Sequence, residues 1–224
     1  QAEEIVAPVR LAWAREAEIV DLPIAQQAYE EPLGPASPER FTLCAPILAG
    51  GADIATEEGR GAVLLFDFGE IQAGRPRIEI DAKGGEEFDI VVSERLPGEY
   101  EAGGIAADAR IERKPFLGLD AHVARYVARS GVQTFETFEW DAVRWLQLTV
   151  RNAPAGVRVK NISVVTTRFP AVRRGHFECS DPTLTRLWLL GARTIELCMH
   201  DGWIDCPSRE QRQWLGDATV EHLA

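Results

Sequence analysis

The sequence has little lysine, a single methionine and no apolar run long enough to cross a membrane. Lysine occurs only at Lys83, Lys114 and Lys160, so nearly all of the basic residues are arginine. We attribute that bias to genome composition. The formal net charge is −11, and a chain this acidic repels phosphate backbones and anionic lipid headgroups. We therefore expect neither nucleic acid nor a membrane as a partner, whereas a neutral ligand such as a sugar is compatible with the charge.

Cysteine patterns typical of metal or redox sites are also missing. The four cysteines are Cys44, Cys179, Cys198 and Cys206, and no two of them have C-x-x-C spacing. No Cys/His cluster has the spacing of zinc ligands, so we predict no metal and no organic cofactor. The thiols are best interpreted as buried and free. Cys206 lacks a nearby histidine in the sequence that could activate it as a nucleophile.

An initiator methionine and a signal peptide are absent as well. We interpret the 224 residues as a fragment of a longer protein that stops inside a helical pattern. The length predicts one or two domains, and a hydrophobic fraction of 46% is sufficient for a real core. The compartment stays open, and the cytoplasm is the favoured expectation.

Most of the chain has the pattern of short strands separated by turns. Gly84, Gly131 and Asn152 lie in such turns, and the period of two is clean across 144–150. Seven strand-like segments with no helix between them predict an antiparallel β-sandwich over 61–170. They are 62–68, 77–81, 88–92, 123–127, 134–138, 143–150 and 157–165. Residues 1–60 are interpreted as a linker or the edge of a preceding domain, and 96–121 as a Gly-rich surface excursion.

The pattern changes to helical near Pro170, so we predict a second domain over 171–224. Asp181 can cap a helix whose first residue is Pro182. Apolar residues then recur with helical spacing as far as Cys198. A second helix is predicted to begin at Ser208, with Gln211 completing a capping box.

The segment DCPSREQRQWLGDA, residues 205–218, carries the chemistry. On a helix that begins at Ser208, Glu210, Trp214, Asp217 and Glu221 would share one face. Such a face suits a sugar site, because carboxylates bind hydroxyls or transfer protons and an indole stacks on a pyranose. Taken singly, each residue also has an ordinary structural interpretation: a turn cap for Asp205, a dipole partner for Glu210, a core position for Trp214.

The same segment resembles bacterial α-L-rhamnosidases of glycoside hydrolase family 78, in which D-C-P-x-R-E-Q or D-C-P-x-R-D-E-R precedes W-x-G-D-A. Residues 175–181, GHFECSD, resemble the entry to the first helix of that family's catalytic barrel. Residues 66–70, FDFGE, resemble the preceding β-sandwich. The resemblance implies a mainly β chain, an antiparallel β-sandwich followed by the first helices of a truncated (α/α)6 barrel.

Site residues and a substrate also follow from the resemblance. It implies that Glu210 is the general acid and that Asp205 and Asp217 hold sugar hydroxyls or support the acid. Arg209 and Trp214 would line the sugar pocket. The expected partner is a rhamnose-containing glycoside or polysaccharide, hydrolysed at terminal α-L-rhamnosyl residues with inversion. The general base is expected downstream of Ala224, so the chain alone should be inactive.

Two other functions remain open at this point. The sandwich could be a non-catalytic carbohydrate-binding module, since sandwiches often bind sugars. Alternatively, the chain could belong to a six-hairpin glycosidase with a different sugar specificity. Binding of glycans without hydrolysis would favour the first alternative, and a panel of glycosides would reveal the second.

The change of pattern near Pro170 makes a testable prediction. A chain truncated near residue 170 should keep its sandwich, because all of the predicted strands precede that point. Circular dichroism of the truncated chain should show the β-type spectrum of the whole. Loss of that spectrum would contradict the predicted boundary.

Overall fold

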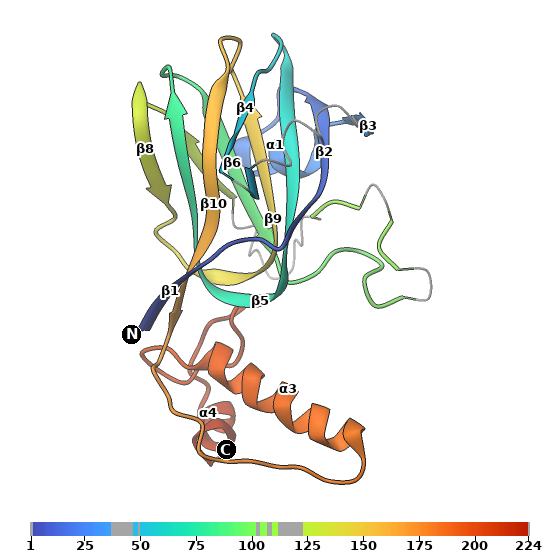
Figure 1. The fold of residues 1–224 in the computed structure, drawn as a ribbon, viewed down its shortest axis with the longest axis vertical. Helices are drawn as coiled ribbons and strands as arrows, with labels where there is room; N and C mark the ends of the chain where they lie inside the picture. The colour runs from blue at the N-terminus through green and yellow to red at the C-terminus, as the bar shows by residue number, and fades with distance from the viewer. Residues whose placement is uncertain are drawn as a thin grey trace.

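The computed structural model describes residues 2–36, 47–48, 50–101, 104–106, 109–111 and 123–223. It is mainly β and antiparallel, as predicted, with few helices (Figure 1). The helices are α1 (Ile24–Glu30), α3 (Pro182–Cys198) and α4 (Leu215–Leu223). The strands are β1 (Ala2–Val6), β2 (Arg10–Glu18), β3 (Leu33–Ala36), β4 (Ala52–Ile54), β5 (Arg60–Ala82), β6 (Glu87–Ser93), β7 (Val123–Val127), β8 (Gly131–Glu136), β9 (Asp141–Arg151) and β10 (Val157–Arg168).

Strand β5 is the element around which the sheet curls. The sequence predicts two strands, 62–68 and 77–81, but the structure joins them into one strand of 23 residues. The first half of β5 pairs with β2 and β9, and the second half pairs with β10 and β8. Because one strand takes part in both halves of the sheet, the halves face each other and enclose a core (Figure 1).

The bend in β5 has a local cause. The register between β5 and β9 shifts between Asp67 and Gln72. Gly69 lies in that interval with a φ of +80°, a backbone conformation that residues other than glycine rarely adopt. Its backbone N–H donates to the Asp67 carboxylate at 2.8 Å. Further along, a side chain at Gly74 would meet the Val165 carbonyl oxygen at 2.3 Å, so the approach of β10 requires glycine.

Asp67 is also a buried carboxylate that binds two partly exposed arginines. The guanidinium groups of Arg10 and Arg144 donate to it, each at 2.9 Å or slightly more. Burial alone would raise the pKa of Asp67, but the hydrogen bonds from Arg144, the Gly69 backbone and Arg10 outweigh it and hold the pKa below its usual value. These contacts join β2, β5 and β9 at the bend.

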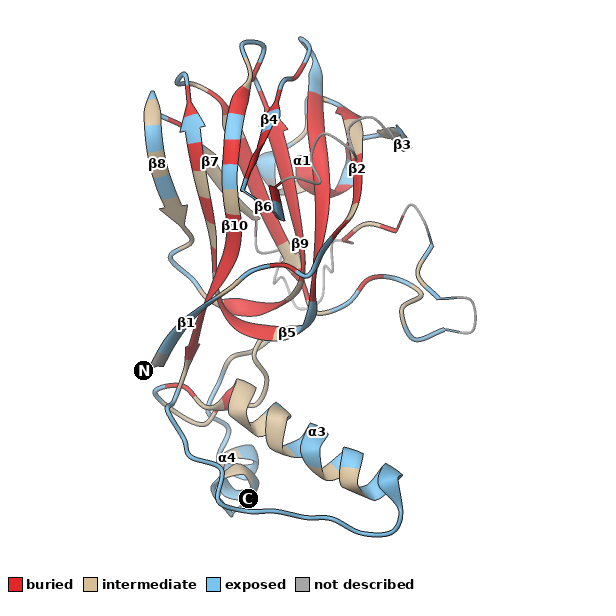
Figure 2. Cartoon of the chain, viewed as in Figure 1, coloured by how far each residue is buried: buried red, intermediate tan, exposed pale blue. Residues whose placement is uncertain are grey.

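Two apolar clusters lie on opposite sides of the layer formed by β2, β5, β9 and β6. The main core fills the space between the two halves of the curled sheet, with Phe66, Ile78 and Phe88 fully buried. The second cluster contains Trp13 and Trp145 and is covered by α1 and neighbouring loop residues. Figure 2 shows the buried residues concentrated in the strands.

The first sixty residues contribute strands to this same sheet. β1 pairs with β10, and β2 pairs with β5 over eight residues. Leu11 and Ala14 of β2 belong to the main core. The short strand β4 pairs with β10. Most of the predicted excursion at 96–121 falls at or beside residues that are not described.

Helix α3 begins as the sequence predicts. The Asp181 carboxylate accepts a hydrogen bond from the Thr183 backbone N–H, and Pro182 is the first helical residue. Only the C-terminal end of α3 approaches the sheet, where the Arg193 guanidinium donates to the Ile71 carbonyl oxygen (Figure 2). The predicted apolar stripe is therefore largely exposed at its N-terminal half: Leu184 and Leu187 are exposed, whereas Cys198 is buried.

We predict that Asp67→Ala lowers the free energy of unfolding by about 2 to 3 kcal/mol, because it removes the charged acceptor of the hydrogen bonds from Arg10, Arg144 and the Gly69 backbone. The depressed pKa means that this contribution is present above an unfolded-state pKa of about 3.9 and is lost as the pH falls through the folded-state value. Urea unfolding at pH 7 and pH 3 measures both effects.

Asp53→Ala is the matched control, because Asp53 pairs with Arg158 on the surface. We expect a change below about 0.5 kcal/mol for it. Equal losses for the two variants would contradict a special role for Asp67 at the bend.

Candidate functional site

The segment predicted to carry the chemistry is a loop closed on itself. The Asp205 carboxylate accepts from the Arg212 backbone N–H at 2.8 Å, and the Asp205 backbone N–H donates to the Arg212 carbonyl oxygen at 2.9 Å. Gln211 adopts a φ of +51°, which no helix interior allows. The prediction of a helix from Ser208 is therefore wrong, and α4 begins at Leu215 instead. The turn at 207–210 does not continue as a helix, because the Asp205 carboxylate binds the Arg212 backbone N–H.

Cys206 is a structural part of this loop. Its thiol donates to the Asp205 carboxylate at 3.1 Å, and its sulfur accepts from the Glu210 backbone N–H at 3.4 Å. Asp205 therefore accepts hydrogen bonds on both oxygens. Burial would raise the pKa of Asp205, but the backbone hydrogen bond from Arg212 and the bond from Cys206 hold it below its usual value.

Three of the predicted site residues meet around Glu210. The Trp214 indole N–H donates to one oxygen of Glu210 at 2.8 Å, and the Arg209 guanidinium donates to the other at 2.5 Å. Trp214 is half exposed, so one part of its ring is available to a ligand. The loop thus brings together an acid, a cation and an aromatic surface although it is not the predicted helix.

The remaining acids, Asp205 and Asp217, are related to Glu221. Asp217 lies exposed in the first turn of α4. Burial, together with the charges of Asp217 and Asp205, raises the pKa of Glu221. One oxygen of Glu221 is buried and has no hydrogen-bond partner among the described residues. Asp205 and Asp217 therefore both lie close enough to Glu221 to raise its pKa.

The β-sandwich contacts this loop through two side-chain hydrogen bonds. The Ser208 hydroxyl donates to the Asp141 carboxylate at 3.1 Å, and the Gln211 amide donates to the Trp140 carbonyl oxygen at 3.1 Å. The Trp140 ring stacks on His200 with centroids 3.8 Å apart. Burial lowers the pKa of His200, so the ring is neutral at pH 7. These contacts join the segment between β8 and β9 to the residues that follow α3.

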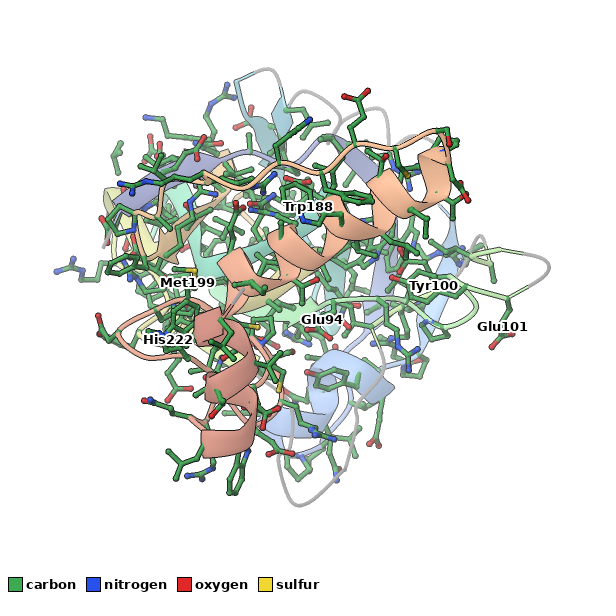
Figure 3. All side chains as sticks on the ribbon, turned by 90° about the horizontal axis from the view of Figure 1, so that it is seen from below. Glu94, Tyr100, Glu101, Trp188, Met199 and His222 are labelled. Atoms are coloured by element: carbon green, nitrogen blue, oxygen red, sulfur yellow. The ribbon has the colours of Figure 1, made fainter. Side chains whose placement is uncertain are left out.

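Trp140 and Asp141 are the site-supporting residues that the sequence analysis missed. They stand in a turn between two strand patterns, and a Trp-Asp pair in such a turn is ordinary. Their role depends on contacts with residues that come about sixty to seventy positions later in the chain, and no local sequence pattern predicts such contacts. Figure 3, viewed from the side of the helices, shows α3 crossing the end of the sandwich, with Met199 after it and His222 on α4.

A small cavity of about 270 Å³ lies beside the loop. His200 and Trp203 contribute rings to its lining, and the Gln213 side chain closes it near Gly202. No group of three or more metal-ligating side chains occurs in the part of the chain that the structure describes. No helix in that same part is long and apolar enough to cross a bilayer.

Comparisons with known proteins agree on one family. The model of the bacterial α-L-rhamnosidase concanavalin-like domain matches residues 57–167, and that of the bacterial α-L-rhamnosidase 6 hairpin glycosidase domain matches residues 172–224. The chain belongs to the bacterial α-L-rhamnosidase family. The two matches meet between β10 and α3, and the second contains the whole loop around Glu210.

Individual rhamnosidases support this membership. An α-L-rhamnosidase of Formosa agariphila is 26% identical over 172 residues, which is 72% of this chain and 16% of that protein. The structure of a family 78 rhamnosidase of Bacillus sp. GL1 has a TM-score of 0.68 at 27% identity and matches 87% of this chain and 19% of that one. A rhamnosidase from Klebsiella oxytoca shares the fold, with a TM-score of 0.66 at 14% identity over 99% of this chain and 40% of that one. The chain thus spans less than half the length of each of these relatives.

The closed loop makes a prediction for this rhamnosidase-family chain. Asp205→Ala should reduce the hydrogen-exchange protection of the Arg212 amide about tenfold, because it removes a bond to a charged acceptor. The lowered pKa of Asp205 means that the unaltered chain keeps this protection above the ordinary aspartate pKa of about 3.9 and loses it as the pH falls through the lowered folded-state pKa.

Asp217→Ala is the control, since Asp217 is exposed and lies on α4. It should leave the Arg212 amide unchanged. Unaltered protection in Asp205→Ala would show that the loop is held by other contacts.

Proposed function

We propose that the chain forms the sugar-binding and acid-supplying part of an α-L-rhamnosidase that acts with inversion. The observation that carries the proposal is the trio in which Trp214 and Arg209 both donate to the carboxylate of Glu210. The trio stands on a segment within the matched catalytic domain. The proposed substrate is a terminal α-L-rhamnosyl residue of a glycoside or polysaccharide.

Glycoside hydrolysis needs a carboxyl group that gives a proton to the leaving oxygen. We assign that role to Glu210, whose side chain is about one-quarter exposed and therefore reachable. Trp214 fixes the carboxyl group through its indole N–H, and the exposed part of its ring can stack on the sugar. Asp205 and Asp217 are proposed to hold sugar hydroxyls or to support the acid.

Arg209 must change partners in this proposal. As long as its guanidinium donates to Glu210, it occupies one oxygen of the carboxyl group that has to meet the leaving oxygen. More than half of the Arg209 side chain is exposed, so the guanidinium has room to turn towards a bound sugar hydroxyl. Substrate binding would then leave that oxygen of Glu210 available to the leaving group.

The inverting mechanism also needs a carboxylate that activates water from the opposite face of the sugar. We propose that this base comes from a part of the catalytic domain that is not in residues 1–224. The chain by itself is then expected to bind rhamnose without turning over a rhamnoside. The proposal is consistent with the chain spanning 16% to 40% of its relatives.

The proposed acid is tested in the protein that carries this chain with the rest of its catalytic domain. Glu210→Gln should lower the rate on rhamnosides with sugar or alkyl leaving groups by about 10² to 10⁴, and far less on dinitrophenyl rhamnoside. A dinitrophenolate departs without a proton, whereas an alkoxide does not. The basic limb of the pH–rate profile should flatten in the same variant.

Asp205→Asn and Asp217→Asn serve as controls, because binding residues should affect both substrate classes alike. If Glu210→Gln slowed both classes equally and kept the basic limb, Glu210 would be a binding residue. Asp205 or Asp217 would then become the candidate acid.

A further inference from the structure

A second cavity lies in the sandwich, close to the helices. It has a volume of about 230 Å³ and opens between strands of the two halves of the curled sheet. Its walls are apolar side chains of β5, β6 and β7, and its rim is the connection between β8 and β9. The lining residues are Pro76, Ile90, Val92, Val123, Ala124, Thr137, Phe138, Glu139 and Asp141.

The rim of this cavity presents an unburied aromatic ring. Phe138 is 95% exposed, the most exposed large apolar side chain among the described residues. It stands next to the exposed carboxylate of Glu139. An aromatic ring and a carboxylate at the mouth of an apolar cavity are the groups that contact a ligand with one flat apolar face and a hydroxyl edge.

The cavity adjoins the candidate site through shared residues. Asp141 lines the cavity and accepts the hydrogen bond from Ser208 of the Glu210 loop. Trp140, between Glu139 and Asp141, stacks on His200 and accepts from Gln211 through its carbonyl oxygen. Figure 1 shows the connection from β8 to β9 descending towards the helices. A ligand that reached from the Glu210 loop to this connection would arrive at the rim of the cavity.

The lining decides which chemical class fits. A sugar ring carries hydroxyls around its whole edge, and the walls formed by Ile90, Val92 and Val123 offer no partners for them. A single aromatic ring has room in an apolar cavity of this size and leaves no polar group without a partner. The exposed carboxylate of Glu139 at the rim can accept a hydrogen bond from a hydroxyl, and the negative charges of Glu139 and Asp141 repel an acidic ligand.

We propose that this cavity is a subsite for one neutral hydroxylated aromatic ring, the aglycone of the rhamnoside. The assignment of the ring as an aglycone rests on the proposed function, whereas the binding of a phenolic ring does not. Phe138 is a binding residue of this subsite and packs against the ring. The β-sandwich thereby takes part in choosing the leaving group, and the Glu210 loop holds the sugar.

Resorcinol, one ring with two hydroxyls, is the probe. Titrated into the 224-residue chain and followed by ligand-observed NMR, it should bind, and Phe138→Ala should weaken the binding about 3- to 10-fold, the range of one aromatic contact. Ala124→Leu fills the cavity from the wall and should weaken it further. Tyr100→Ala removes another exposed aromatic ring, from a different loop, and should have no effect.

No binding of resorcinol to the unaltered chain, or equal affinity in the unaltered chain, Phe138→Ala and Ala124→Leu, would overturn the proposal. Circular dichroism should show that the variants are folded, and Phe138→Ala removes no buried side chain. A parallel titration with L-rhamnose separates the two proposals. Loss of rhamnose binding in Trp214→Ala reports on the sugar site, and Phe138→Ala should leave rhamnose binding unchanged.

Discussion

The membership of β5 in both halves of the sheet is the constraint on which the remaining structure depends. Its bend requires a residue with positive φ at Gly69 and a carboxylate at Asp67 that satisfies the turned backbone and two arginines. Without that bend, the second half of β5 could not carry β10 and β8 over the core. The connection from β8 to β9 would then lie elsewhere, and the Glu210 loop would lose its contacts with the sandwich.

The candidate site depends on two kinds of contact: those between residues close in the sequence and those between residues far apart in it. Within the loop, Asp205 and Cys206 fix the backbone so that Glu210, Arg209 and Trp214 converge. Between domains, Asp141 and Trp140 hold the loop through its Ser208 and Gln211 side chains. Residues 1–224 by themselves therefore hold the segment with the proposed acid against the sandwich. A site shared in this way can take contributions to specificity from both sides.

The sequence predicted the fold class because alternation and turn residues are local signals, and they located β7, β9 and β10 closely. It also predicted the cap of α3, since Asp181 and Pro182 act within one turn. The sequence-based prediction failed at residues 208–214, where a hydrogen bond to the backbone prevents the helix that the capping residues favour. The capping box at Ser208 is present in the residues, but Asp205 binds the Arg212 backbone and Gln211 turns the chain. Trp140 and Asp141 escaped notice because their partners lie about sixty to seventy residues away.

The pairing of β10 with both β1 and β5 has a consequence for the order of events during synthesis. A ribosome releases the chain from the N-terminus, and β1 waits without its partner until the last strand of the sandwich has emerged. The curled sheet can close only when residue 168 is out, just ahead of α3. The helices then leave the ribosome when the sandwich has only just closed, and both α3 and α4 carry exposed leucines. A pause in translation beyond that point would give the sandwich time to close before those leucines could meet its unfinished strands.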